Sequence, residues 1–255
     1  MYKEVDIMKN IKQEELNKIL KEHELWLKGE GWERADLNDT NLNHTNLRFI
    51  DLRRADLRGT NLRYTNLNYA NLEGANLEGA DLSDTNLRYS DLSNANLNNV
   101  NFKYADLSNA DLSYANLRGA NLEGANLKCA DLRYADLEYV KTNMHTIGYN
   151  LACPEKGSFI GYKKASEYLI ELLILDDAKR SSATTTKCRT NKVKVLEIRD
   201  IRTGKKVNEV NSDYDNSFIY KVGEIVSVDN FDNNRWNECT SGIHFFMNRE
   251  DAINY

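Results

Sequence analysis

The chain contains 255 residues, with 34 basic and 39 acidic side chains and a formal net charge of −5, which argues against a general nucleic-acid-binding protein. No apolar run approaches the roughly 20 residues that a membrane-spanning helix needs. Four cysteines in a chain of this length do not form a disulfide framework, and the charged residues 1–10 lack an apolar signal core, so we expect a cytoplasmic protein with reduced thiols.

The first predicted element is a helix that begins at Asn10, with Gln13 as the partner in a capping box. Apolar residues recur at helical spacing on one face from Leu16 to Leu27, and Gly29 ends the helix. The end of a stacked repeat exposes unpaired strand edges and apolar side chains. Because the helix directly precedes such a repeat, we expect residues 1–34 to be a lead and a capping helix. The alternative is a helix that binds a partner or a second copy.

A strict five-residue repeat occupies residues 35–140. A leucine stands at every fifth position from Leu37 to Leu137, except for Phe102, and Asp or Asn precedes it each time. The residue two places before the leucine is small or β-branched, and the two residues after it vary freely. A short repeat of this regularity dictates the architecture of the segment that carries it.

The repeat fits a strand of three residues followed by a corner of two. Side chains at alternate strand positions share a face, so the leucine and the small residue point inward and the Asp or Asn points outward. The next inward residue comes three places later, so the chain must turn within the two variable residues, where glycine suits a positive φ. Successive coils then stack as parallel strands roughly 4.8 Å apart. The inward core includes Leu37, Leu57, Leu77, Leu97, Phe102, Leu117 and Leu137.

The repeat reads A(D/N)LXX and closely resembles that of the pentapeptide repeat family over residues 35–140. The resemblance implies a right-handed quadrilateral parallel β-helix with Leu or Phe inside, and the number of sides comes from the resemblance. With four sides per coil, the 21 repeats make about five coils and a rod about 25 Å long. We place the repeat domain at residues 35–145.

The variable corner residues offer candidate surfaces. One edge carries Phe49, Tyr69 and Tyr89, a partial aromatic ladder that we predict as a partner surface, the alternative being simple stacking of like residues. Residues 34–140 hold 11 basic and 15 acidic side chains, with arginines clustered near the start. One branch of the family mimics DNA and protects DNA gyrase. That function needs a strongly acidic rod, so we keep it only as an alternative.

Residues 146–255 have an ordinary globular composition and form a second predicted domain. Alternating apolar residues and turn signals predict an α+β domain dominated by antiparallel strands, which makes the whole chain mainly β. The expected elements are strands at 158–162, 168–175, 193–201 and 242–246, a hairpin of strands 218–222 and 224–228, and a helix at 248–255. The alternative for 168–175 is a short helix.

Four short segments of this domain carry a second resemblance. They are Lys179-Arg180-Ser181-Ser182, Lys187-Cys188-Arg189, Glu238-Cys239 and residues 242–246. On these segments the domain resembles an uncharacterised domain that follows pentapeptide repeats in phage and bacterial proteins. That resemblance implies no known chemistry.

A basic segment rich in hydroxyl groups is the candidate anion site of this domain. Its cations and hydroxyls are of the kind that hold a phosphate. The alternative is that these charges pair with the acidic residues of 207–238 or are solvated. The site residues would be Arg180, Ser181, Ser182, Lys187 and Arg189.

The cysteines allow two further hypotheses about chemistry in this domain. The first is a Cys₃His zinc site, whose donors would be Cys153, Cys188, Cys239 and His244. The second is a catalytic pair in which Cys239 is the nucleophile and His244 is its base. The cysteines lack the close spacing of zinc ligands, so we favour buried structural thiols and predict no metal, no cofactor and no catalysis.

We therefore expect a non-enzymatic interaction or scaffold protein. Its rigid rod would present a C-terminal recognition domain to a protein partner, while the composition disfavours nucleic acid and predicts no membrane partner. The alternative is that the C-terminal domain is an anion-binding or enzymatic module. The sequence does not predict the oligomeric state.

Overall fold

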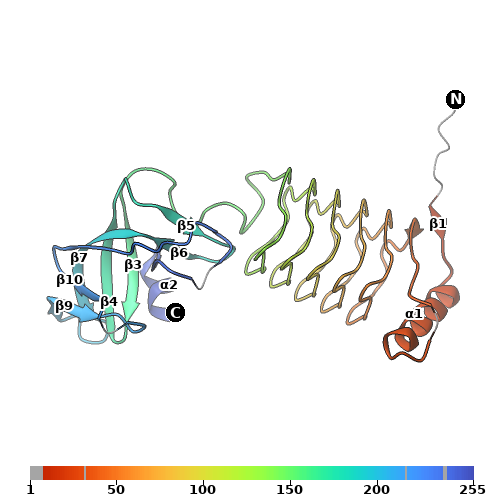
Figure 1. Cartoon of the computed structure of the whole chain (residues 1–255), viewed down its shortest axis with the longest axis horizontal. Helices are drawn as coiled ribbons and strands as arrows, with labels where there is room; N and C mark the ends of the chain where they lie inside the picture. Colours follow the sequence, from red (N-terminus) through yellow and green to blue (C-terminus); the bar gives the residue numbers. More distant parts are fainter. Residues whose placement is uncertain (1–7, 32, 216, 238–239) are drawn as a thin grey trace. The chain divides into compact units, whose positions relative to one another are not determined.

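The computed structural model describes residues 8–31, 33–215, 217–237 and 240–255. Contacts within the chain divide it into two compact units, Met1–Asn150 and Leu151–Tyr255. Figure 1 shows stacked coils in the first unit and a sheet in the second. The chain is therefore mainly β, as predicted.

Parallel pairing joins residues 20 positions apart throughout the repeat. Asp36 pairs with Asp56, and the same step continues until Asn121 pairs with Lys141. The core leucines from Leu37 to Leu127 donate their backbone amides to the next coil, as Leu77 does to the Asn96 carbonyl at 2.8 Å. A step of 20 residues contains four pentapeptides, so each coil has four sides.

The second corner residue of every repeat has a positive φ, whether or not it is glycine. The angle is 62° at Gly59 and 59° at Tyr69. A hydrogen bond of 3.0 Å from the Ala70 amide to the Leu67 carbonyl closes the turn, and a positive φ at its third residue is typical of type II. The Tyr69 amide also donates to Arg88 on the next coil at 3.0 Å. These bonds hold tyrosine and asparagine in a conformation that glycine adopts more readily.

The Asp or Asn before each leucine stabilises the corner that follows. The side-chain oxygen of Asn76 accepts a hydrogen bond from the Glu78 amide at 3.2 Å, the geometry of an Asx turn. Asn76 also accepts from the side chain of Asn96 on the next coil at 3.0 Å. The repeat therefore requires a short side chain with an oxygen at this position.

The inward side chains form a closed core. Leu137 is only partly buried, since the regular coils end just after it. Threonines at the small position are compatible with burial because their hydroxyls find acceptors, as Thr60 does at the Leu37 carbonyl, 2.8 Å away. The fully buried predicted core residues are Leu37, Leu57, Leu77, Leu97, Phe102 and Leu117.

The N-terminal segment differs from its prediction. Strand β1 (Lys9–Asn10) pairs in parallel with β2 (Thr40–Asn41), and the helix α1 (Gln13–Leu27) begins three residues later than expected. The predicted capping box is therefore wrong, because Asn10 is committed to the ladder and the actual N-cap, Lys12, makes no side-chain capping bond. The Asn41 amide group donates to Asn10 at 3.2 Å, so β1 continues the outward ladder.

Helix α1 contacts the first coil through a buried histidine. Nδ1 of His23 accepts a hydrogen bond from the Ala35 amide at 3.1 Å, and the ring stacks on Trp26 with centroids 5.6 Å apart. Burial lowers the pKa of His23, although the nearby charge of Asp51 acts in the opposite direction. The neutral ring is thus the form that fits this contact.

This contact makes the stability of the repeat unit depend on pH. A histidine with a lowered pKa stabilises the fold above its unfolded pKa of about 6.5, and the contribution is lost as the pH falls below that value. We expect acidification from about pH 7 to about pH 5 to cost on the order of 1 kcal/mol more in the wild type than in the His23→Gln variant. Thermal unfolding of both proteins at both pH values measures the difference. Equal losses would contradict the role of His23.

The second unit is built on one antiparallel sheet. The strands follow the order β11-β7-β4-β3-β12-β6-β5, and β8 pairs with β7 beside this path. Its core gathers Ile170, Cys188, Val195 and Phe245. The strands are β3 (Phe159–Ala165), β4 (Tyr168–Ile174), β5 (Arg180–Ser182), β6 (Lys187–Thr190), β7 (Lys192–Asp200), β8 (Lys206–Val207), β11 (Ile225–Ser227) and β12 (Ile243–Phe246).

Two local predictions meet different outcomes here. The predicted hairpin around Gly223 does not form. Instead, β10 (Ile219–Lys221) pairs with β9 (Glu209–Asn211), whereas β11 pairs with β7. The two segments therefore pair with strands that precede them in the chain rather than with each other. The closing helix exists as α2 (Arg249–Asn254), capped by Asn248, whose side chain accepts from the Asp251 amide at 2.8 Å.

Candidate functional site

One side of the coil, which we name the aromatic side, combines exposed rings on both of its edges. It comprises residues 43–49, 63–69, 83–89, 103–109 and 123–129. On the predicted edge, Phe49 stacks on Tyr69 at 5.3 Å and Tyr69 on Tyr89 at 4.9 Å between centroids. These rings remain 64%, 46% and 44% exposed.

The opposite edge of the aromatic side carries a second ladder that the prediction missed. His44 stacks on Tyr64 at 4.9 Å, and Tyr104 is exposed further along the same edge. A separate stack, Tyr114 on Tyr134 at 4.8 Å, lies on another edge of the coil. Sorting the second corner residues of all four sides, rather than of one, would have found both from the sequence.

Cations accompany the rings of the aromatic side. The guanidinium of Arg48 lies 4.6 Å from the centre of the Phe49 ring, and that of Arg63 lies 5.1 Å from the Tyr64 ring, within cation–π range. The aromatic side holds five basic and three acidic residues, whereas the rest of residues 34–140 holds six and twelve. The exposed rings are therefore on a side that is basic relative to the rest of the coil.

The predicted anion residues lie on the paired strands β5 and β6, but the groups of both arginines are used within the fold. The guanidinium of Arg189 is buried and donates to the carbonyls of Asp232, Asn234 and Ser241 at 2.9–3.2 Å. Arg180 donates to the Leu175 carbonyl at 2.7 Å. Both arginines thus hold loops through backbone carbonyls.

The other three predicted anion residues also have partners within the fold. Ser182 Oγ accepts from the Ala152 amide at 2.8 Å, and Ser181 lies 3.4 Å from an Arg189 nitrogen. Lys187 donates to the Tyr255 hydroxyl at 2.8 Å and is the one member of the predicted set that lines the pocket described below.

The cysteine predictions depend on a residue outside the described part of the chain. Cys239 is not among the described residues, so neither the zinc site nor the nucleophile and base that included it can be placed. Cys153 and Cys188 are buried, and a hydrogen bond between them lowers the pKa of the Cys153 thiol. In the described ranges, no three His, Cys, Asp or Glu side chains gather as metal ligands.

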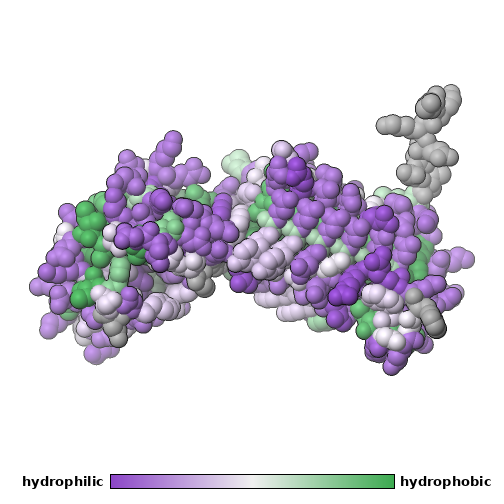
Figure 2. All heavy atoms as spheres, in the orientation of Figure 1, coloured by the Kyte–Doolittle hydropathy of each residue, from purple (hydrophilic) through white to green (hydrophobic). Residues whose placement is uncertain are grey.

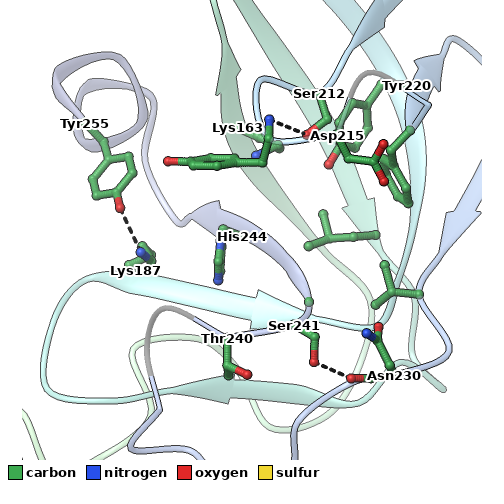
Figure 3. Close-up of a pocket in the computed structure, with 15 residues that line it drawn as sticks. Lys163, Lys187, Ser212, Asp215, Tyr220, Asn230, Thr240, Ser241, His244 and Tyr255 are labelled. Atoms are coloured by element: carbon green, nitrogen blue, oxygen red, sulfur yellow. Dashed lines mark hydrogen bonds between the residues drawn. The ribbon is translucent and has the colours of Figure 1, made fainter.

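A pocket of about 470 Å³ opens in the second unit (Figure 3). Strand β3 contributes Lys163, β6 contributes Lys187 and β12 contributes His244, while Phe218 and Tyr220 line it from the segment around β10. A smaller hollow of about 200 Å³ is also lined by Lys163 and His244. The sequence does not predict this pocket, because its residues come from segments that are distant along the chain.

Lys163 is the least expected member of the pocket. It is 8% exposed, and burial lowers the pKa of its ammonium group, opposed by the charge of Asp213 and assisted by that of Lys187. Its nitrogen lies 5.8 Å from the centre of the Tyr220 ring. Burial also raises the pKa of the Tyr220 hydroxyl, so that group stays neutral.

The surface of the repeat unit is mainly hydrophilic on the face that Figure 2 shows. No helix within the described ranges is both long and apolar enough to cross a lipid bilayer.

Comparison with known proteins supports the first resemblance. Residues 35–68, 65–103 and 105–138 match the model of pentapeptide repeats, which confirms the predicted repeat class. A pentapeptide repeat protein from the cyanobacterium Cyanothece 51142 is 31% identical, with 43% of this chain and 85% of that chain covered, at a TM-score of 0.35. One from the thylakoid lumen of Arabidopsis thaliana is 29% identical, with 40% and 71% covered, at a TM-score of 0.39.

The second unit matches a family of unknown function, DUF5758, over residues 149–252.

A curated relative, an uncharacterised protein of Acanthamoeba polyphaga mimivirus, is 35% identical over 86 residues, which are 32% of this chain and 54% of that protein. The chain thus spans about half the length of this relative. The predicted link of the second domain to phage and bacterial proteins stays a prediction.

Proposed function

We propose that the protein is a non-enzymatic scaffold whose repeat unit docks a protein partner on the aromatic side, while the second unit serves in recognition. The observation that carries this proposal is the pair of exposed ladders, which include Tyr69 and Tyr64, with Arg48 and Arg63 against the rings. Tyrosine and arginine are the residues most often found at the energetic centres of protein interfaces. The repeat core gives these side chains fixed positions, so little entropy is lost when a partner binds.

The distribution of charge defines the kind of partner. Because the aromatic side is basic while the remainder of the coil is acidic, it suits a protein surface with apolar pockets and an acidic rim. The same distribution disfavours a DNA mimic, since the phosphate pattern of DNA requires acidic groups along the whole rod. The cytoplasmic location predicted from the sequence stays a prediction.

The test is partner capture with a variant in which Phe49, Tyr69 and Tyr89 are all serine. We expect its captured partner to fall more than tenfold relative to the wild type, since each central aromatic residue of an interface contributes about 2 kcal/mol. The matched control replaces Tyr114 and Tyr134 by serine, which removes a similar stack from another edge. Quantitative mass spectrometry measures the capture, and circular dichroism checks the fold. Equal capture by both variants would disprove docking on the aromatic side.

A further inference from the structure

The pocket of the second unit has the composition of a ligand site rather than of a packing defect. Its volume of about 470 Å³ falls within the range of roughly 300–1,000 Å³ that is usual for small-molecule pockets. Its walls combine the rings of Phe218, Tyr220 and Tyr255 with the cationic side chains of Lys163 and Lys187. The one carboxylate among the described lining residues, Asp215, accepts hydrogen bonds from the amide and hydroxyl of Ser217 at 2.9 and 2.6 Å. Apolar walls with a few convergent charges are typical of sites that bind a small molecule.

The buried ammonium of Lys163 indicates the charge of the ligand. The described residues offer it no hydrogen-bond acceptor and no carboxylate within ion-pair distance, and its contact is with the face of Tyr220. Asp213, whose charge acts on it from further away, accepts hydrogen bonds from the amide and hydroxyl of Ser166 at 3.0 and 2.6 Å. An ammonium group that is mostly buried loses part of its hydration, and a bound anion would offset that cost.

A second lysine strengthens the attraction for an anion. Lys187 is only 5% exposed, and its positive charge acts on Lys163. Its ammonium lies 4.8 Å from the centre of the Tyr255 ring and donates to the hydroxyl of that residue. Two like charges in one pocket repel each other, so a negative group placed between them is favoured by both.

The remaining walls indicate the shape of the ligand. Phe218 and Tyr220 pack edge to face with centroids 5.2 Å apart, and Tyr255 supplies a third ring at the lysine end. Aromatic walls of this kind stack well on a flat ring. We propose that the pocket binds a small molecule that joins a phosphate or carboxylate group to a flat ring. Lys163 and Lys187 hold the anionic group, and the aromatic walls hold the ring.

Calorimetric titration of the full chain tests the proposal with four probes: AMP, adenosine, salicylate and benzyl alcohol. We expect AMP to bind at least about tenfold more tightly than adenosine, or salicylate at least about tenfold more tightly than benzyl alcohol. The reason is that a hydrogen bond to a charged group is worth about 1.5–3 kcal/mol. Stronger binding of AMP identifies the anion as phosphate, and stronger binding of salicylate identifies it as carboxylate. The proposal is wrong if neither binds more tightly than about 1 mM, or if adenosine and benzyl alcohol bind as well as their charged counterparts.

Two variants locate the bound anion. Lys163→Met and Lys187→Met preserve most of the side-chain volume, and each should weaken binding about tenfold or more. Lys205→Met, at an exposed lysine beyond the end of β7, is the matched control and should bind as the wild type does. The melting temperature of each variant shows whether it folds. Unchanged affinity in both folded pocket variants would overturn the assignment.

Discussion

Replacing Leu77 by alanine is expected to lower the free energy of unfolding of the repeat unit by about 2–5 kcal/mol, because the substitution leaves a cavity in a packed core. Leu77 is fully buried in a middle coil and lies between the equivalent residues Leu57 and Leu97 of the neighbouring coils. Neighbouring coils share one core, so the loss reaches both adjacent layers. Leu77→Asp should be worse, since it buries a charge without a partner.

Two controls separate the loss of core packing from a general effect of substitution. Leu137→Ala removes the same atoms from a partly buried position at the end of the ladder and should cost clearly less. Glu78→Ala, at the exposed corner next to Leu77, should change stability by no more than about 0.5 kcal/mol. Urea unfolding followed by circular dichroism measures all four variants. Equal losses at Leu77 and Leu137 would show that the coils do not form a continuous core.

Replacing Arg189 by methionine is expected to destabilise the second unit by about 3 kcal/mol or more, since each buried carbonyl left without a donor costs about 1–3 kcal/mol. The guanidinium holds the carbonyls of Asp232, Asn234 and Ser241 and lies 5.3 Å from the Phe231 ring. Arg189→Lys should not restore the loss, because one ammonium group lacks the planar fork that reaches several carbonyls at once.

Arg202→Met is the matched control for the Arg189 variant. Arg202 is exposed on the turn after β7, so its loss should have little effect on stability. Hydrogen exchange of the amides in the described parts of 231–241 should increase in the Arg189→Met protein and not in the control. A variant of Arg189 that kept full stability but lost affinity for phosphate would instead favour the predicted anion site.

Most of the repeat unit could be predicted because its information is local. Leu77, its neighbour Asn76 and the turn after them each have a role set by position within five residues, and the same roles recur in every repeat. The N-terminal segment departs from this logic. Asn10 has the local features of a helix cap, yet pairing with Asn41, 31 positions away, satisfies its backbone and side chain instead. A local capping motif does not form where pairing with a distant strand provides more hydrogen bonds.

The second unit could be predicted only in part, because its pairing is mostly nonlocal. The strand at 168–175 was identified from its own apolar run, but the fate of Ile225 depended on β7 rather than on the turn at Gly223. Lys163 stands in a strand where a lysine normally faces solvent. The neighbouring β12 and the segment around Tyr220 help to enclose it, and neither can be placed beside it from the local sequence.

The amino-acid sequence by itself determined the coil, its buried leucines and the edge that carries Phe49, Tyr69 and Tyr89, since a strict period converts position in the chain directly into position in space. Only the tertiary structure decided that Arg189 donates hydrogen bonds to backbone carbonyls, that β1 extends the ladder and that Lys163 and Lys187 line the same pocket. These outcomes depend on which distant segments come into contact. The burial and hydrogen bonding that favour one set of contacts over another arise only when the whole domain is folded.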